Sequence, residues 1–307
     1  MVKLFKNFIL SSRPKQWLKN LSLYAALVFS GYLLDTQKFL LVTMAVVIFS
    51  LLSSAVYLLN DVVDISQDRL HPFKRFRPIA SGELSVPLAL TAAIAGFSLS
   101  LFLAANLSFF FFLACLVYLL LQIAYSFSLK NVAILDVLII AAGFILRVYA
   151  GALVINVHLS VWFLLCVTSV SLFLSVGKRR AELAILAEQA PKHRKTLGLY
   201  PSALLDDYLS MFASSTWMSW ALFTFFEPAP TPHPILALLG VPLTFSGVGK
   251  WLMITIPVVV YGIMRYLKII YEGNRAQSPE SVLLSDKPLL ASVLIWGILI
   301  VGIIYGI

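Results

Sequence analysis

The sequence is poor in charged residues and in cysteine. Only 12% of its 307 residues are Asp, Glu, Lys or Arg, whereas 60% are hydrophobic and the mean hydropathy is +0.93. A soluble domain of this size cannot bury so much apolar side chain, because much of its surface stays in water. Cys115 and Cys166 lie far apart within apolar runs, which excludes a disulfide framework and a CxxC metal site.

Familiar short motifs of soluble enzymes are also missing. The chain has no P-loop, no GxGxxG and no GxSxG, and its four histidines show neither HxH nor HxxxH spacing, which argues against a histidine metal site. In a soluble protein the formal net charge of +9 would suggest nucleic acid. In a membrane protein it indicates loop orientation and anionic substrates or lipids, so we expect membrane lipids and no nucleic acid as partners.

Long apolar runs dominate the chain. A membrane-spanning helix needs about 20 mostly apolar residues, and we count nine such runs. We therefore predict an all-α polytopic membrane protein with nine transmembrane helices, forming a single domain over residues 1–307. The predicted spans are residues 20–35, 39–59, 86–105, 108–126, 132–155, 159–177, 208–226, 251–271 and 289–306. Gly31 and Asp35 suggest that the short first span is tilted or kinked.

The distribution of basic residues predicts the orientation. With the N-terminus in the cytoplasm, all but three of the 23 Lys and Arg residues fall at cytoplasmic loops or helix ends. Residues 1–19 are then an interfacial basic helix broken at Pro14, and the polar loops 60–85 and 178–207 face the cytoplasm. The proline-rich connection 227–250 lies outside. We predict a cell-membrane protein whose chemistry faces the cytoplasm.

One loop concentrates acidic and then basic residues. Asn60, Asp61, Asp64 and Asp68 fall within roughly one quarter of a helix circumference at about 100° per residue. Carboxylates gathered on one face repel each other unless a cation lies among them. An all-oxygen ligand set suits Mg²⁺ shared with phosphate oxygens. We predict that these four residues bind Mg²⁺ and that the three aspartates are catalytic; the alternative is a solvated, charge-balanced loop.

Basic and polar side chains nearby are the predicted substrate-binding residues. Arginine and lysine are suited to phosphate groups. The alternatives are positive-inside loop charge and helix-stabilising ion pairs. An intramembrane arginine is costly and is expected to face the bundle interior with a partner. The predicted residues are Lys19, Lys74, Arg75, Arg77, Tyr125, Lys130, Asp136, Arg147, Lys178, Arg179, Glu182, Tyr200 and Asp206.

These segments resemble the UbiA superfamily of intramembrane prenyltransferases. The resemblance rests on NDVVDISQD followed by HPFKRFRPIASG in a nine-span chain, and it extends over essentially the whole sequence. The segments RPKQWLKN, YSFSLKNVAILDVLIIAAGFILRVYAGA and GKRRAEL resemble the decaprenyl-phosphate phosphoribosyltransferase branch. That resemblance implies Mg²⁺-dependent transfer of 5-phosphoribose from phosphoribosyl pyrophosphate to a polyprenyl phosphate, in the synthesis of cell-wall arabinan precursors.

The chain departs from the aromatic-prenylating members of the superfamily at one place. Those members carry a second aspartate-rich loop after span six, where this sequence has GKRRAEL and later LLDD. A phosphate-bearing second substrate would explain this exchange of acid for base. The alternatives are a UbiA-type transferase that moves a prenyl group to an aromatic or glycerol-phosphate acceptor, and a transporter or lipid-binding protein without chemistry. Oligomeric state, including a homo-oligomer, is left open.

Overall fold

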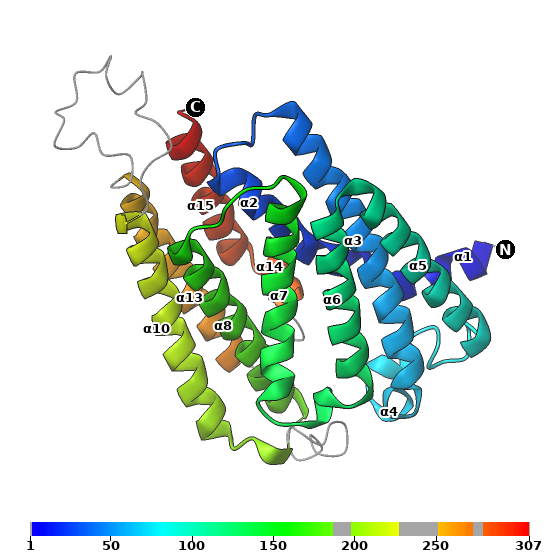
Figure 1. The fold of residues 1–307 in the computed structure, drawn as a ribbon. Coiled ribbons are helices and arrows are strands. Elements are labelled where there is room, and N and C mark those ends of the chain that lie inside the picture. The colour runs from blue at the N-terminus through cyan, green and yellow to red at the C-terminus, as the bar shows by residue number, and fades with distance from the viewer. Residues whose placement is uncertain (1, 187–197, 227–250, 273–278, 307) are drawn as a thin grey trace, which may run out of the picture. The chain divides into compact units, whose positions relative to one another are not determined.

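The computed structural model describes residues 2–186, 198–226, 251–272 and 279–306, and within these ranges the prediction of an all-α fold is confirmed, with no strand present (Figure 1). The predicted connection 227–250 and residues 187–197 of the second polar loop lie outside the described residues. The elements are α1 Val2–Ser12, η1 Pro14–Leu23, α2 Tyr24–Phe29, α3 Thr36–Val63, α4 Ile65–Leu70, η2 Lys74–Phe76, α5 Val86–Leu107, α6 Phe109–Phe127, η3 Leu129–Asn131, α7 Leu135–Val154, α8 Val161–Leu186, α10 Ser202–Phe226, η7 Leu252–Thr255, α13 Ile256–Glu272, α14 Pro279–Ser285 and α15 Lys287–Tyr305.

Seven of the described helices are long and apolar enough to span a membrane: α3, α5, α6, α7, α8, η7 with α13, and α15. The protein is therefore a multi-pass membrane protein. The remaining predicted span within the second half, residues 208–226, corresponds to α10, a helix of 25 residues. α10 is not among the seven helices identified by length and composition, so the count of nine transmembrane helices stays a prediction.

The first predicted span is not one helix, which corrects the prediction for residues 20–35. The 3₁₀ helix η1 ends at Leu23, and α2 is only six residues long and ends at Phe29. The chain then turns at Gly31, whose φ of 78° lies in the left-handed region that ends helices and that glycine adopts without steric cost. The predicted break of the N-terminal helix at Pro14 is confirmed, because α1 ends at Ser12 and η1 begins at Pro14.

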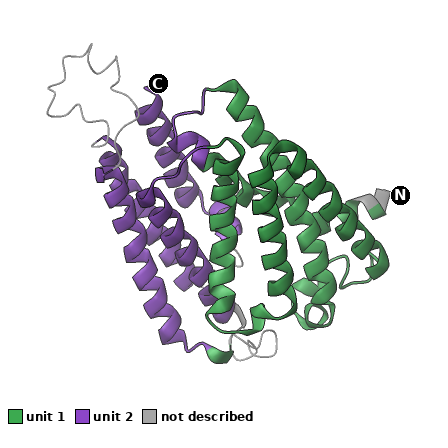
Figure 2. Ribbon diagram, in the orientation of Figure 1, with its two compact units in different colours: residues 1–25, 35–156, 188–199 green, residues 26–34, 157–187, 200–307 purple. Residues whose placement is uncertain are grey.

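The described chain divides into two compact units (Figure 2). Unit 1 contains residues 1–25, 35–156 and 188–199, and unit 2 contains residues 26–34, 157–187 and 200–307. The prediction of a single domain over residues 1–307 stays a prediction. Each unit is described below by itself.

In unit 1, α3 is the central helix, and it packs against α1, η1, α5, α6 and α7. Near the C-terminal end of α3, Leu58 belongs to a buried cluster with Ile79, Leu84, Ala89 and Ala93. Because Ile79 and Leu84 belong to the connection between α4 and α5, this cluster fixes the polar loop against the helices. A loop anchored by buried side chains at both flanks can hold charged groups in defined positions.

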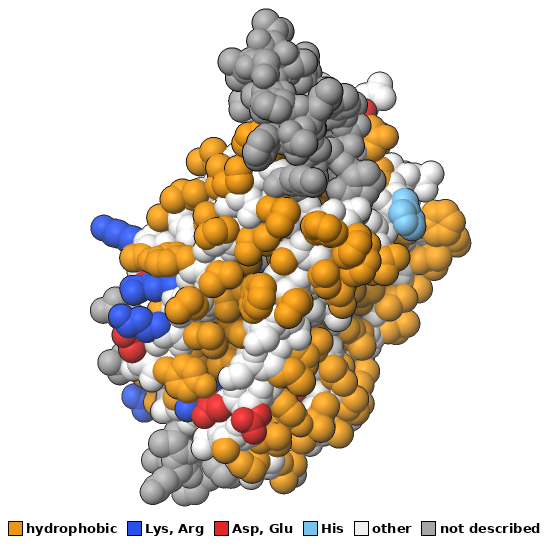
Figure 3. Space-filling model, turned by 90° about the vertical axis from the view of Figure 1, so that its left-hand side faces the viewer, with side chains coloured by type: hydrophobic (Ala, Val, Ile, Leu, Met, Phe, Trp, Pro, Cys, Tyr) orange, Lys and Arg blue, Asp and Glu red, His pale blue; other side chains and the backbone are white. Residues whose placement is uncertain are grey.

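In unit 2, α8 and α10 pair along their lengths, and α13 packs against α15. Aromatic rings fill this unit near α2: Phe29 lies 4.7 Å from Phe163 and 5.6 Å from Phe223 between ring centroids. Arg265 on α13 forms a bidentate ion pair with Asp286, the N-cap residue of α15 (3.0 and 2.8 Å). Hydrophobic side chains cover most of the face drawn in Figure 3, while Lys and Arg gather along one edge of it.

Candidate active site

The acidic motif lies where α3 ends and α4 begins. Asn60 and Asp61 belong to the last turn of α3, Asp64 is its C-cap, and Asp68 lies in α4. The N–H of Asp64 donates to the carbonyl of Asn60 (2.9 Å), and that of Asp68 donates to the carbonyl of Asp64 (2.8 Å). Backbone hydrogen bonds from residue i+4 to residue i therefore continue across the junction.

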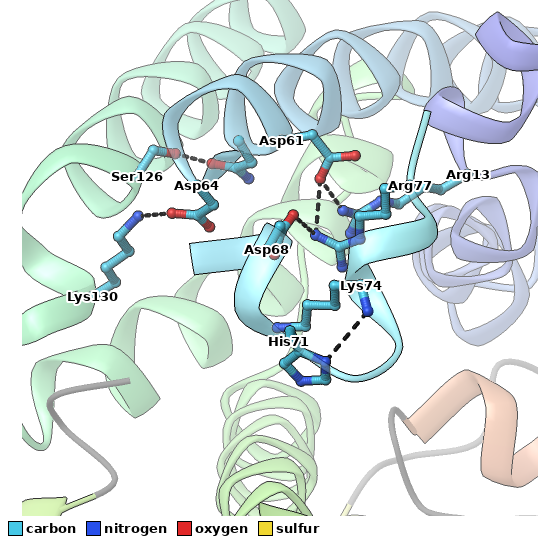
Figure 4. Close-up of polar contacts among 10 residues, drawn as sticks. Arg13, Asp61, Asp64, Asp68, His71, Lys74, Arg77, Ser126 and Lys130 are labelled. Carbon is cyan, nitrogen blue, oxygen red and sulfur yellow. Dashed lines mark hydrogen bonds and ion pairs between the residues drawn. The ribbon is translucent and has the colours of Figure 1, made fainter. Parts of the chain in front are cut away.

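Two of the carboxylates converge on a single guanidinium nitrogen. Nη1 of Arg77 donates to Oδ1 of Asp61 (3.0 Å) and to Oδ2 of Asp68 (2.6 Å). Arg13, which follows α1, also pairs with Oδ1 of Asp61. Figure 4 shows both arginines on the same side of the motif, facing Asp61 and Asp68.

Because these two carboxylates are buried, their negative charge is unfavourable unless it is compensated. Asp61 is 2% exposed and Asp68 is 3% exposed. Burial raises the pKa of the Asp68 carboxyl above its usual value, and the charges of Arg77 and Lys74 act in the opposite direction. Because buried carboxylates must be compensated by cations or hydrogen bonds, this position suits a cationic group.

Asn60 and Asp64 instead contact the last turn of α6 and the segment η3 that follows it. Lys130 in η3 pairs with Oδ1 of Asp64, and the hydroxyl of Ser126 donates to Oδ1 of Asn60. In Figure 4, Asp64 is directed toward Lys130, away from the arginines around Asp61. The structure thus brings Lys130, predicted from sequence to bind substrate, to the acidic motif.

The basic run after the motif forms a small turn. Nδ1 of His71 accepts hydrogen bonds from the backbone N–H groups of Phe73 (3.2 Å) and Lys74 (3.3 Å). Arg75 is exposed, and its guanidinium lies 4.8 Å from the ring centroid of Phe76. Of the three predicted phosphate-binding residues in this run, Arg77 contacts the aspartates directly and Lys74 is close enough to Asp68 to affect its pKa.

Sequence reasoning missed the role of the segment before and along η1. Arg13 binds Asp61 and also lies 4.9 Å from the ring centroid of Tyr57. Further along, Nε1 of Trp17 donates to Oγ of Ser54 (2.9 Å). The available signal was the spacing of donor residues in RPKQWLKN, but the sequence does not reveal that this segment runs antiparallel to α3.

Asn20 continues this series of contacts, and we call the whole series the η1–α3 ladder: Arg13 to Asp61 and Tyr57, Trp17 to Ser54, and Asn20 to Ser50 and Ser53. The amide of Asn20 donates to the hydroxyls of Ser50 (2.9 Å) and Ser53 (3.2 Å). Its carbonyl oxygen accepts a hydrogen bond from Nε of Arg147 (2.9 Å). The ladder therefore connects the intramembrane arginine to the acidic motif.

Arg147 is enclosed, as predicted for an intramembrane arginine. It is 5% exposed, and besides Asn20 it donates to the hydroxyl of Tyr118 (2.8 Å) and to the carbonyl of Gly143 (2.6 Å). Rings surround the guanidinium, with that of Tyr118 at 4.9 Å and that of Phe49 at 5.4 Å. Its side-chain partners Asn20 and Tyr118 come from other helices, whereas the carbonyl of Gly143 belongs to α7 itself.

The other predicted residues of unit 1 lie around these groups. Lys19 donates to Oε1 of Gln16 (2.6 Å) within η1. Tyr125 is half-buried near the end of α6, and Asp136 is fully buried in the first turn of α7. A carboxylate in the first turn of a helix is stabilised by the helix dipole. Binding of substrate by these three residues stays a prediction.

In unit 2, the predicted residues lie around the end of α8 and the start of α10. The helix of predicted span six, residues 159–177, extends into the polar segment that follows, because α8 ends at Leu186. Within this extension, fully buried Arg179 pairs with Glu182 (2.5 Å). Arg180, which sequence reasoning did not single out, donates to Oδ1 of Asp206 (2.6 Å), which also accepts from the hydroxyl of Tyr271 (2.9 Å).

Lys178 is half-buried on α8, and Tyr200 is buried just before α10. The Asp206 contacts join α8, α10 and α13, so they have a structural role in this unit. Substrate binding by the predicted residues of unit 2 stays a prediction.

The residues of the motif fit a magnesium ion in their chemistry. In the described part of the chain no three His, Cys, Asp or Glu side chains lie close enough together to hold a metal. Mg²⁺, however, is commonly bound by one or two carboxylates together with water and substrate phosphates. Asp61 and Asp68, which converge on the Arg77 nitrogen, supply two such carboxylates.

An all-α membrane fold with buried carboxylates and basic side chains gathered at one helix end is the arrangement expected of an intramembrane transferase. The profile of the UbiA prenyltransferase family matches residues 21–285. The chain belongs to this family and is a transferase.

Two relatives and one solved structure are similar over most of the chain. Decaprenyl-phosphate phosphoribosyltransferase of Corynebacterium glutamicum is 35% identical over 95% of this chain and 85% of its own. The enzyme of the same name from Mycolicibacterium smegmatis is 35% identical over 95% of this chain and 91% of its own. A UbiA homologue from Archaeoglobus fulgidus bound to DMAPP and Mg²⁺ superimposes with a TM-score of 0.68 at 20% identity, covering 98% of this chain and 100% of its own, which shows a shared fold.

Proposed function

We propose that the protein transfers 5-phosphoribose from phosphoribosyl pyrophosphate to a polyprenyl phosphate of the decaprenyl type and releases pyrophosphate. The observation that carries the proposal is that the carboxylates of buried Asp61 and Asp68 converge on one guanidinium nitrogen of Arg77. Arg13 and Lys130 add further positive charge around the motif. Such an arrangement provides carboxylates for a metal and cations for a diphosphate. The two phosphoribosyltransferases that are 35% identical support this choice of donor and acceptor.

The motif residues would hold Mg²⁺ in this reaction. Asp61 and Asp68 are the foremost candidates for its ligands, because their carboxylates converge on one nitrogen of Arg77. Asn60 and Asp64 complete the predicted set of ligands. Bound there, the metal would neutralise charge on the diphosphate leaving group.

The basic residues would act on the phosphate groups directly. Lys74, Arg75 and Arg77 bind diphosphate oxygens and stabilise the negative charge that develops as pyrophosphate leaves the anomeric carbon. The lipid phosphate is already an anion near neutral pH, so its attack requires no general base. Lys130 and Arg147 are the candidates in unit 1 for orienting phosphates, and Lys178 and Arg179 remain predicted substrate-binding residues of unit 2.

A cellular role follows from this chemistry. The product would be a phosphoribosylated polyprenyl phosphate, which we place in the synthesis of cell-wall arabinan precursors. The hydrocarbon chain of the acceptor would stay in the membrane. We place the N-terminus and the acidic motif on the cytoplasmic side of the cell membrane, because nearly all Lys and Arg residues fall on that side in the predicted topology.

A transfer assay tests the proposal. Protein purified in detergent would be incubated with Mg²⁺, labelled phosphoribosyl pyrophosphate and a polyprenyl phosphate, and labelled lipid would be extracted. We expect labelled lipid that disappears with EDTA and in Asp64→Asn. Asp35→Asn is the matched control, because Asp35 caps the opposite end of the same helix with its side chain, and asparagine can also cap.

The family suggests one competing activity, which the same preparation can test. If no labelled lipid forms but a prenyl group is transferred from prenyl diphosphate to an aromatic acid or a glycerol phosphate, with release of diphosphate, the acceptor and donor assigned above are wrong and the protein is a prenyltransferase. If folded protein catalyses neither reaction, a transport or lipid-binding role would replace both.

A further inference from the structure

Each aspartate of the acidic motif is already paired with a basic side chain from another part of the chain. Arg13 comes from the N-terminal segment, Arg77 from the loop after α4, and Lys130 from η3. Arg77 bridges two carboxylates through one nitrogen atom, which is the place where a metal shared by both would lie. The cation position and the metal position therefore overlap at Asp61 and Asp68.

The pairs cannot simply be broken, because the carboxylates are buried. Asp61 and Asp68 are almost completely inaccessible, whereas the side chains of Arg13 and Arg77 are 25% and 26% exposed. Removing one partner of a buried ion pair leaves an uncompensated charge and is strongly unfavourable. A metal that takes the carboxylates must therefore displace the arginines, and the partly exposed arginines need another anion.

Arg13 shows that its position is imposed by the surrounding structure. Its φ of 52° and ψ of 64° lie in the left-handed region, which is uncommon for residues other than glycine. Its guanidinium is held between the carboxylate of Asp61 and the ring of Tyr57. Strained residues that are held by several contacts are concentrated at functional sites.

We propose that Arg13 and Arg77 are exchangeable counter-ions: they neutralise the motif in the absence of substrate and pass to the substrate diphosphate when a metal takes Asp61 and Asp68. The metal and the diphosphate then bind as a unit, because each supplies the charge that the other displaces. By linkage, pyrophosphate strengthens metal binding by the same factor as the metal strengthens pyrophosphate binding. This inference rests on the metal–diphosphate part of the proposed function and is independent of the sugar and the acceptor.

The proposal predicts an unusual sign for one substitution. Removing a competing cation strengthens binding of the metal alone, although the same arginine is needed for the diphosphate. We expect Arg77→Gln to bind metal alone about tenfold more tightly, equivalent to about 1.4 kcal/mol, and to bind pyrophosphate at saturating metal at least about tenfold more weakly. Arg13→Gln is expected to shift both affinities in the same directions.

Arg69→Gln is the matched control for the change in charge. Arg69 lies in α4 next to Asp68, but its Nε donates to the carbonyl of Ala80 (3.1 Å). The substitution therefore removes one positive charge from the same segment but leaves Arg13 and Arg77, the ion-pair partners of Asp61 and Asp68, in place. Any general electrostatic effect of lost charge on metal affinity appears in this variant as well.

The experiment uses the full chain purified in detergent. Free Mn²⁺, as a probe for Mg²⁺, is counted by electron paramagnetic resonance in titrations without pyrophosphate, and binding of radiolabelled pyrophosphate is measured at saturating Mg²⁺. Tighter Mn²⁺ binding in Arg77→Gln and Arg13→Gln than in Arg69→Gln, with weaker pyrophosphate binding, supports the exchange. Mn²⁺ affinity equal to or lower than that of Arg69→Gln overturns it.

Two features keep this test decisive. If Arg77→Gln does not fold, Arg13→Gln carries the comparison, because Arg77 still bridges Asp61 and Asp68 in that variant. Neither measurement depends on phosphoribosyl transfer, so an exchange that holds in a protein without transfer activity would point to a different donor. An active transferase without the exchange would leave the proposed function intact.

Discussion

Gly151 in α7 lies against η1, the segment that positions Arg13 at the acidic motif. Its replacement by alanine therefore tests the helix packing and the site together. A Cβ atom at this position in α7 would lie 2.0 Å from the carbonyl oxygen of Leu23 and 2.7 Å from its carbonyl carbon. Both obstacles are backbone atoms of η1, so a change of rotamer cannot relieve the contact. The two elements must separate by about 1.5 Å to restore a normal non-bonded distance of about 3.5 Å.

The expected magnitude follows from two opposing effects. Alanine in a helix is favoured over glycine by about 1 kcal/mol, whereas forcing an extra methyl group into a packed interface costs about 1–3 kcal/mol and sometimes more. Because the obstacle is rigid, we expect a net loss of about 2 kcal/mol of stability. Displacement of η1 would also move Arg13 and Asn20, and a misplacement of about 1 Å near a reacting group can lower activity about 100-fold.

Thermal unfolding in detergent, followed by tryptophan fluorescence, measures the stability change. Gly297→Ala is the matched control, since a Cβ at this position in α15 meets no atom within 4 Å, and it should leave the unfolding midpoint unchanged or raise it. We expect Gly151→Ala to lower the midpoint by several degrees and to reduce transfer activity at temperatures where it is folded. A Gly151→Ala protein as stable and active as the control would refute the close contact between α7 and η1.

Two further substitutions test other contacts. The Arg265 guanidinium holds the pKa of the Asp286 carboxyl below its ordinary value of 3.8, so this ion pair stabilises the fold above that pH and its contribution is lost as the pH falls through the lowered pKa. Asp286→Asn retains the helix cap and should abolish this pH dependence of stability in acid unfolding. An acid-unfolding profile that is unchanged in the variant would contradict the ion pair. Trp17→Phe removes the hydrogen bond to Ser54 (2.9 Å) and should cost about 1 kcal/mol in thermal unfolding, with weaker pyrophosphate binding because Arg13 is positioned by the same segment; full retention of both properties would count against the ladder.

The sequence was most informative where a pattern is local. The hydrophobic runs predicted the helices of both units, since burial in lipid requires continuous apolar stretches whatever the neighbouring helices are. The spacing of Asn60, Asp61, Asp64 and Asp68 predicted that they share one face of a helix. The hydrogen bonds across Asp64 are helical, but the Asp64 side chain pairs with Lys130, away from Asp61 and Asp68 (Figure 4). The apolar run 159–177 predicted most of α8, which extends further, to Leu186, through the polar residues that follow.

The remaining features depend on contacts between segments that are distant in sequence. Nothing local to Arg13 indicates that it meets Asp61, 48 residues away, or that Asn20 meets Arg147, 127 residues away. The first predicted span shows a second limit of prediction from sequence. Its composition is apolar, as in a spanning helix, but the turn at Gly31 follows α2, which is only six residues long. Likewise, the convergence of Asp61 and Asp68 without Asp64 depends on where Arg77 and Lys130 lie.

The η1–α3 ladder explains how uncharged side chains of a basic segment can place a charged group accurately at the acidic motif. A 3₁₀ helix has three residues per turn, so Trp17 and Asn20 lie on the same side of η1 and can both reach hydroxyl groups on α3. Hydrogen bonds in an apolar surrounding are costly to leave unmade, so they fix the register of η1 along α3. That register brings Arg13, at the start of η1, to Asp61, at the end of α3. The position of one counter-ion of the acidic motif is therefore determined by uncharged contacts about one and two turns away.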